Sequence, residues 1–521
     1  MEQPSPPTNS HGLAMQTAFS SWREKLATGL GPYVASGVIL AFFIRFVLPA
    51  CRAHFAPDDM LNIYYYWSRG PLQLTKGLLL FASSYYRPMG GVFYSVLYSL
   101  YGLNPLPYHI TISGLIIVNS YLAYRFAFLI SDSPLVGAAT ALLTTYHSNL
   151  ASLVYWPSFV YDVLCFTFFF SALNYYISIR QNGRLLTKRQ MLIFTALYVC
   201  ALESKEMAVS LPLGVMLYEL LWHAPARRSW KCVHHWFLHE GLASLIAGVL
   251  TLVYVVGKTS GSGALVRNEL YKPLFSWHRF AESNVLYLNT LFYRSPREGF
   301  TVFTLIASWL ALFCIAWRRR EKHVWLMAFF VVFAPLPIAF LPPRVAGRVY
   351  IPLVAWAIIL STLYLDLATL LKNLPPLHRV SLQQLRVALA LIAIPCIWTV
   401  NKHADRSSLP WMYARGELTW SFLQQLRAAN LPLKPNSEIV FLNDPFSDGP
   451  SARWNALFIT ELFYHDHTIK VLLARMMPVS SGRIAAADLV LTWKDGRLMR
   501  VGSSLSSEDP FCATVAQRGL R

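Results

Sequence analysis

Residues 33–59, YVASGVILAFFIRFVLPACRAHFAPDD, join a long apolar run to two adjacent carboxylates. The run over 33–50 is too long and starts too late for a cleaved signal peptide, and no small-residue cleavage site follows it. It therefore predicts a retained signal anchor, with the polar segment 1–32 in the cytoplasm. Asp58 and Asp59 then fall just beyond the outer end of the first membrane helix.

The composition extends this pattern to most of the chain. Of 521 residues, 55% are hydrophobic and 14% are charged, whereas soluble globular domains carry about 25% charged residues. A disordered chain is excluded because it needs low hydrophobicity. The sequence predicts an α-helical polytopic membrane protein with about 11 to 13 transmembrane helices. Further apolar runs lie near 89–103, 108–130, 134–153, 160–179, 190–203, 207–222, 237–257, 301–317, 324–341, 349–371 and 384–400.

The net charge of +19 is spread over short clusters between the apolar runs, so it predicts no nucleic-acid partner. Four clusters read as cytoplasmic loops by the positive-inside rule. They are RQNGRLLTKR (180–189), RRSWKCVHH (227–235), RRREKH (318–323) and KNLPPLHR (372–379). Alternation then places 203–206, 258–300, 341–348 and the tail after 400 outside. Between 89 and 160, three runs lie where an even number of crossings is needed, so one run must be split, re-entrant or non-spanning.

The long apolar runs of the chain end at about residue 400. EIVFL from Glu438 reads as a buried strand, and DLVLTW from Asp488 reads as a strand that enters a KDGR turn. We therefore expect a transmembrane domain over 33–400 and a small external α/β domain over 401–521.

Acidic residues are scarce in the membrane part, with only 15 before residue 400. An ionisable group in a membrane segment is a functional candidate by default. Repulsion and burial raise the pKa of at least one member of an adjacent carboxylate pair, which suits a general base. A plain helix start with Asp as its cap is an equal alternative for this pair. Five acids fall at predicted external helix ends, namely Asp58, Asp59, Asp162, Glu203 and Glu206.

Several cations share the predicted external side, against the positive-inside trend. Arg87 follows Tyr86 at a helix entry, where an arginine can hold a phosphate through paired hydrogen bonds or snorkel from an aromatic belt. Lys205 lies in the turn over 203–206, which is either a plain polar turn or part of a phosphate site. Arg344 and Arg348 are four residues apart and would share a face on a helix.

Other chemistry is not supported by the sequence. HWFLHE over 235–240 is not a zinc-protease motif, and no glycine-rich phosphate loop is present. We therefore expect no cofactor and no metal site, since nothing in the sequence supports a divalent cation.

The order of these motifs resembles the GT-C superfamily of membrane glycosyltransferases. Asp58-Asp59 resembles the Asp-Glu of protein O-mannosyltransferases and lipid A aminoarabinose transferases, and Tyr86-Arg87-Pro88 resembles their Arg/Lys-Pro motif. Lys205 resembles the lysine of Lys-Gly-Pro, with Glu206 in place of the glycine. Arg348-Val-Tyr350-Ile-Pro resembles Arg-Tyr-x-x-Pro, with Val349 in place of the tyrosine. The sequence pattern is also similar to that of the membrane half of tetratricopeptide-bearing O-mannosyltransferases, although no tetratricopeptide tail follows.

The resemblance implies an inverting transfer of a sugar from a polyprenyl-phosphate donor to a hydroxyl acceptor on protein, lipid or polysaccharide. It implies catalytic roles for Asp58 and Asp59 at the outer face of the bacterial cytoplasmic (inner) membrane, with the tail on the periplasmic side. The phosphate-binding residues would be Arg87, Lys205, Arg344 and Arg348, supported by Tyr86, Asp162, Glu203, Glu206 and Tyr350. A transporter of a lipid-linked or anionic solute and a non-catalytic membrane scaffold are the alternatives.

Overall fold

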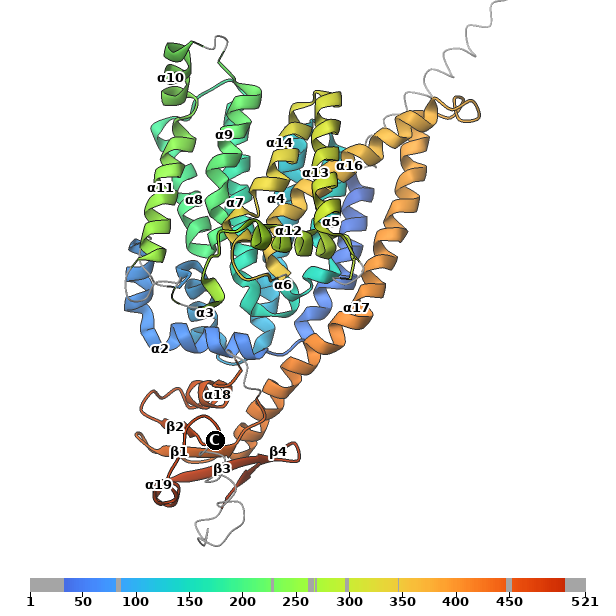
Figure 1. The fold of residues 1–521 in the computed structure, drawn as a ribbon. Coiled ribbons are helices and arrows are strands. Elements are labelled where there is room, and N and C mark those ends of the chain that lie inside the picture. The colour runs from blue at the N-terminus through green and yellow to red at the C-terminus, as the bar shows by residue number, and fades with distance from the viewer. Residues whose placement is uncertain are drawn as a thin grey trace, which may run out of the picture.

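A computed structural model describes residues 32–80, 86–225, 229–260, 267, 269–295, 299–344, 346–446 and 452–501 (Figure 1). The predicted cytoplasmic segment 1–32 lies outside the described residues except for Pro32. The described chain forms a bundle of helices and, beyond one end of it, a small sheet with two helices.

Eight helices in the described residues are long and apolar enough to cross a membrane. Each has at least 18 residues, and a helix of that length approaches the ~30 Å of the hydrocarbon core. The chain is therefore an integral membrane protein, as its composition predicts. The eight are Pro32–Arg52, Pro105–Ser131 (α4), Pro157–Arg180 with α7 (Val160–Arg180), Leu242–Thr259 (α11), Val302–Arg319 (α13), Lys322–Ala339 with α14 (Lys322–Phe333) and α15 (Leu336–Ala339), Gly347–Lys372 with α16 (Tyr350–Lys372), and Leu382–Ala429 (α17).

Other helices complete the bundle. The predicted number of about 11 to 13 spans exceeds the eight candidate spans because it counted some of these helices as membrane crossings. These other helices are α2 (Pro57–Leu79, kinked at Gly70), α3 (Pro88–Tyr101), α5 (Pro134–Thr145), α6 (Ser152–Tyr155), α8 (Lys188–Ser204), α9 (Leu211–Trp222), α10 (Trp230–His239) and α12 (Trp277–Leu291). The single turns are η1 (Phe43–Val47), η2 (Leu48–Arg52), η3 (Ser148–Leu150), η4 (Pro157–Phe159), η5 (Glu206–Ser210), η7 (Glu269–Tyr271) and η8 (Ala346–Val349).

The apolar run predicted over 134–153 is split, which was one of three expected solutions to the odd crossing count. Helix α5 ends at Thr145, and the next two residues are extended. The break is held from outside, because the Tyr146 hydroxyl and Ser148 Oγ both donate to Asp405 Oδ1 on α17, at 2.7 and 2.5 Å. Hydrogen bonds to a buried carboxylate on a neighbouring helix thus stabilise the break between α5 and η3.

The two ends of the bundle differ as the basic clusters predict. Helix α10, the α13–α14 connection and the α16–α17 connection lie at one end, and α2 and the sheet lie at the other (Figure 1). The described residues 229–235, 318–323 and 372–379 of three basic clusters therefore share an end. Helix α2 runs across the opposite end of the bundle rather than through it.

The C-terminal unit is α/β, as predicted. Its sheet has the order β2-β1-β3-β4, in which β1 pairs in parallel with β2 and β3 while β4 is antiparallel to β3. Phe441 on one face packs with Phe422 of α17, and Val440 on the other face packs with Ile484 of α19. The elements are β1 (Glu438–Asn443), α18 (Asn455–Tyr464), β2 (Lys470–Leu473), α19 (Ser481–Ala486), β3 (Leu489–Lys494) and β4 (Arg497–Arg500).

Candidate functional site

The two adjacent carboxylates at the start of α2 have different surroundings. Asp59 is fully buried; its Oδ2 accepts from the Ala56 N–H at 2.6 Å and its Oδ1 from the Ser158 N–H at 2.5 Å. Burial raises the pKa of Asp59 to about 8, while the two backbone donors act in the opposite direction. These contacts cap α2 and tie it to η4, and the catalytic role expected for Asp59 stays a prediction.

Asp58 is half-buried, and its Oδ1 is buried without a hydrogen-bond partner among the described residues. Such an atom needs an explanation because buried polar groups are nearly always paired. Asn62 and Tyr66 follow Asp58 at intervals of four residues, so the three side chains share one face of α2.

Arg87 is held at the entry to α3 by its backbone. Pro88 occupies the first helical position, and Arg87 takes a left-handed conformation with φ of 43°, which is uncommon for a side chain larger than glycine. The Tyr66 hydroxyl lies 2.7 Å from the Tyr86 carbonyl and 3.1 Å from the Arg87 carbonyl. The α2 face that carries Asp58 therefore fixes the strained residue.

The Arg87 guanidinium is 7% exposed and lies among three aromatic rings. Its Cζ lies 4.6 Å from the centre of the Tyr86 ring, 5.0 Å from Tyr161 and 5.9 Å from Tyr271. Its Nη2 donates to both carboxylate oxygens of Glu206, at 3.0 and 2.9 Å. Its Nε has no partner among the described residues, so a buried N–H remains free to donate.

Tyrosine hydroxyls connect Asp58's face of α2 to this cation. Tyr161 Oη donates to Asn62 Oδ1 at 2.9 Å and lies 3.3 Å from Tyr66 Oη. Because the Tyr161 ring also faces Arg87, one tyrosine touches both halves of the site. Tyr86 Oη and Tyr271 Oη are 3.2 Å apart on the other side of the guanidinium.

The turn over 203–206 supplies a second ion pair beside the first. Lys205 Nζ donates to both Asp162 oxygens, at 2.5 and 2.6 Å, and both residues are buried. The Lys205 charge is thus neutralised in this structure, and its phosphate-binding role stays a prediction. Burial raises the pKa of Glu206, but the charges of Arg87 and Lys205 outweigh burial and lower it to about 2. Glu203 lies 3.8 Å from Lys258 Nζ.

The segment Pro342–Pro352 reaches the same place. A Cβ on Gly347 would overlap the Asp162 carboxylate, so only glycine fits there without displacing the pair. Arg348 Nη1 donates to the Pro342 carbonyl at 3.2 Å, and the charge of Arg348 acts on Glu206. The Tyr350 ring stacks on Phe166 with centroids 4.2 Å apart, and its hydroxyl is buried without a partner among the described residues.

The expectation that Arg344 and Arg348 share a helical face was wrong. Only Ala346–Val349 forms a 3-10 turn, and Arg344 precedes it. Arg344 Cζ instead lies 5.7 Å from the centre of the Tyr271 ring, the same ring that faces Arg87. Tyr271 therefore lies between two of the predicted phosphate-binding arginines.

The contacts above join Arg87 to Glu206, Lys205 to Asp162, and Arg344 to the Tyr271 ring that also faces Arg87. Asp58 shares an α2 face with Asn62 and Tyr66, and Glu203 lies beside Lys258. Sequence reasoning missed the aromatic lining, since tyrosines in apolar runs read as core or as an interfacial belt. The position of Tyr161 directly before Asp162 is the one sequence signal that could have marked Tyr161 as a site residue. No comparable signal marks Tyr271. The missed residues are Asn62, Tyr66, Tyr161, Lys258 and Tyr271. No group of three or more His, Cys, Asp or Glu side chains that could hold a metal occurs in the described residues.

Comparisons with known proteins identify no family by sequence. No protein-family model and no curated protein matches the chain. Among solved structures, the chain is similar to the crystal structure of ArnT from Cupriavidus metallidurans bound to undecaprenyl phosphate. The identity is 13%, over 92% of this chain and 99% of ArnT, and the TM-score is 0.48.

Proposed function

We propose that the chain is an inverting glycosyltransferase of the GT-C type, which moves a sugar from a polyprenyl-phosphate donor to a hydroxyl acceptor. The observation that carries this proposal is the unpartnered Asp58 Oδ1. It lies on the α2 face that connects through Asn62 and Tyr161 to Arg87. A free carboxylate oxygen and a free guanidinium N–H are the two groups that such a transfer needs.

In the proposed reaction, Asp58 Oδ1 accepts the proton of the acceptor hydroxyl. The acceptor oxygen forms a bond to the anomeric carbon, and the bond from that carbon to the phosphate oxygen breaks. The electron pair of the broken bond stays on the leaving polyprenyl phosphate. Attack opposite the leaving group inverts the anomeric centre.

Arg87 is the proposed donor to the leaving phosphate through its unpartnered Nε. A preorganised donor aimed at developing charge lowers the activation barrier by about 3 kcal/mol. Arg344 is the second candidate because it faces the same Tyr271 ring. Arg348 adds positive potential while its Nη1 donates to the Pro342 carbonyl. Lys205 is paired with Asp162, so a phosphate that binds to Lys205 must compete with this pair.

The decisive experiment measures transfer from a panel of polyprenyl-phosphate sugars to membrane extracts, with the purified protein in proteoliposomes. General-base catalysis is worth about 10²–10⁴-fold, so we expect Asp58→Asn to lose at least a hundredfold in kcat. Asp132→Asn is the matched control, since Asp132 is exposed at the far end of α4. Full transfer by Asp58→Asn would overturn the assignment.

The same proteoliposomes test the alternatives. Movement of the lipid-linked or anionic solute without transfer would establish a transporter. A scaffold predicts that Asp58→Asn and Arg87→Gln have no effect while removal of residues 405–521 abolishes function.

A further inference from the structure

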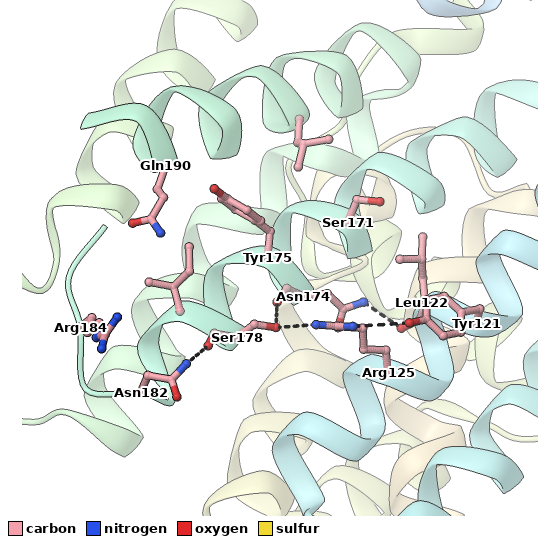
Figure 2. Close-up of a pocket in the computed structure, with 12 residues that line it drawn as sticks. Tyr121, Leu122, Arg125, Ser171, Asn174, Tyr175, Ser178, Asn182, Arg184 and Gln190 are labelled. Atoms are coloured by element: carbon pink, nitrogen blue, oxygen red, sulfur yellow. Dashed lines mark hydrogen bonds between the residues drawn. The ribbon is translucent and has the colours of Figure 1, made fainter. Parts of the chain in front are cut away.

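A pocket of about 500 Å³ opens between α4, α7 and α8, well away from the carboxylate site (Figure 2). Ser178 lines it, and Ser178 follows Asp162 by 16 residues along α7, a rise of about 24 Å. The pocket therefore lies near the opposite end of the bundle, next to the predicted cytoplasmic cluster 180–189. Nothing in the proposed glycosyl transfer uses it.

The pocket holds an arginine that belongs to a membrane-spanning helix. Arg125 lies on α4, six residues before the end at Ser131, which is about 9 Å along the axis. Its Nη1 lies 3.4 Å from Tyr121 Oη and its Nη2 donates to Ser178 Oγ at 3.2 Å (Figure 2). No acidic side chain pairs with it among the described residues. Arg125 is exposed, so its guanidinium is accessible to a ligand, and a cation in a span marks a functional position by default.

A second arginine stands at the mouth of the same pocket. Arg184 lies in the connection between α7 and α8, lines the pocket and is exposed. Its side chain forms no ion pair with another described residue. Two arginines with no acidic partner among the described residues thus line one pocket, at opposite sides of it in Figure 2. A guanidinium group is suited to a phosphate.

A buried acceptor supplies the third element. Asn174 lines the pocket and is 3% exposed. Its Nδ2 donates to the Leu122 carbonyl at 3.0 Å, which fixes the amide orientation, and its Oδ1 has no partner among the described residues. A buried oxygen of this kind needs a donor, which the phosphodiester group of a lipid does not provide.

We infer that this pocket binds the headgroup of a glycerophospholipid that carries both a phosphate and a hydrogen-bond donor, such as phosphatidylglycerol. The phosphate pairs with Arg125, Arg184 adds positive charge at the mouth of the pocket, and a headgroup hydroxyl donates to Asn174 Oδ1. The acyl chains follow the exposed apolar surface of the bundle, where Ile117 of α4 and Leu192 of α8 are 54% and 68% exposed. We favour a lipid over a free phosphate because the pocket lies between helices of the membrane bundle. Arg125 is six residues, or fewer than two helical turns, from the end of α4.

Native mass spectrometry of the full-length protein in detergent tests this inference, and its result is independent of glycosyl transfer. Phosphatidylglycerol, phosphatidylcholine with the same acyl chains, and inorganic phosphate are titrated separately. We expect phosphatidylglycerol to bind tightest, because phosphatidylcholine lacks the donor and inorganic phosphate lacks the chains.

Loss of one charged hydrogen-bonding partner weakens binding about tenfold. We therefore expect Arg125→Gln to lower the affinity for phosphatidylglycerol about tenfold, and Arg184→Gln to lower it by a smaller factor. Arg379→Gln, an exposed arginine outside the pocket, should leave it unchanged. Equal binding of both lipids with no effect of Arg125→Gln would overturn the inference. Inorganic phosphate that competes fully with phosphatidylglycerol would overturn the assignment of a lipid.

Discussion

Asp58 and Asp59 show how one residue of separation decides a role. Successive residues of a helix point about 100° apart, so the two carboxylates of α2 face different surroundings. Asp59 turns toward Ala56 and Ser158, where both of its oxygens are hydrogen-bonded. Asp58 lies on the face with Asn62 and keeps one oxygen free. The sequence pair is therefore one structural carboxylate and one candidate base.

At a pH above 8, where the Asp59 carboxyl is ionised, Asp59→Asn should lower stability, because an amide has one acceptor oxygen where the carboxylate uses two. Loss of a helix cap costs about 1 kcal/mol, and an unpaired buried N–H costs about 1–3 kcal/mol. We expect a lower thermal unfolding temperature than wild type, measured by tryptophan fluorescence in detergent. Asp132→Asn, exposed at the end of α4, should unfold like wild type; equal unfolding of Asp59→Asn would contradict the capping role.

The Arg87–Glu206 pair predicts a pH dependence of stability. The pKa of Glu206 is lowered from an ordinary 4.5 to about 2, since the charges of Arg87 and Lys205 outweigh burial. A lowered carboxylate pKa adds stability that is present above about pH 4.5 and is lost as the pH falls toward 2. The unfolding temperature should therefore drop across this window in the wild type.

Glu206→Gln should be less stable than wild type at neutral pH, because it leaves the Arg87 charge buried without its partner. It should also show a smaller drop below pH 4.5. Glu269→Gln is the control, since the Glu269 side chain is 83% exposed. A pH profile of Glu206→Gln that parallels wild type would show that the pair contributes nothing.

At the scale of elements, the site depends on the close approach of η8 to α7. Gly347→Ala places a methyl group against Asp162, which must shift either the turn or the Asp162–Lys205 pair. Overpacking of this kind costs about 1–3 kcal/mol. We expect a lower unfolding temperature and weaker transfer. Gly114→Ala in α4 meets nothing within 4 Å and should be neutral or slightly stabilising.

At the scale of the whole molecule, the C-terminal unit docks onto the helix that carries Asp58. Tyr64 Oη of α2 donates to Glu461 Oε2 of α18 at 2.9 Å, and the Tyr64 ring stacks on Phe458. Tyr98 of α3 donates to the Leu462 carbonyl at 2.7 Å. The unit therefore positions α2 from the side opposite the bundle.

A double-mutant cycle measures this docking. Tyr64→Phe and Glu461→Gln should couple by about 1–2 kcal/mol in unfolding free energy, because they share one hydrogen bond to a charged group. Tyr64→Phe with Glu438→Gln should be additive, since Glu438 pairs with Arg483 elsewhere in the sheet. Additivity in the first cycle would contradict the docking contact.

Much of this architecture was predictable because membrane helices have local sequence signals. Apolar runs, basic loop clusters and proline at helix starts are one-dimensional signals. They located the eight long apolar helices and the strand from Glu438, although they also counted shorter helices as spans. The split near Thr145 was expected only as one of three solutions, because Asp405, which holds Tyr146, lies 259 residues away. Arg344 was misplaced because a four-residue spacing has meaning only within a helix.

The sequence by itself determined that the chain is a membrane protein and where its cations and acids fall along the chain. These properties follow from hydropathy and charge, which each residue carries without reference to distant neighbours. Only the tertiary structure decided which charges neutralise each other, that Asp59 is a cap, and that Tyr161 and Tyr271 surround Arg87. Those outcomes depend on side chains that meet across the fold, and pairing energies in a low-dielectric interior are set by such distances.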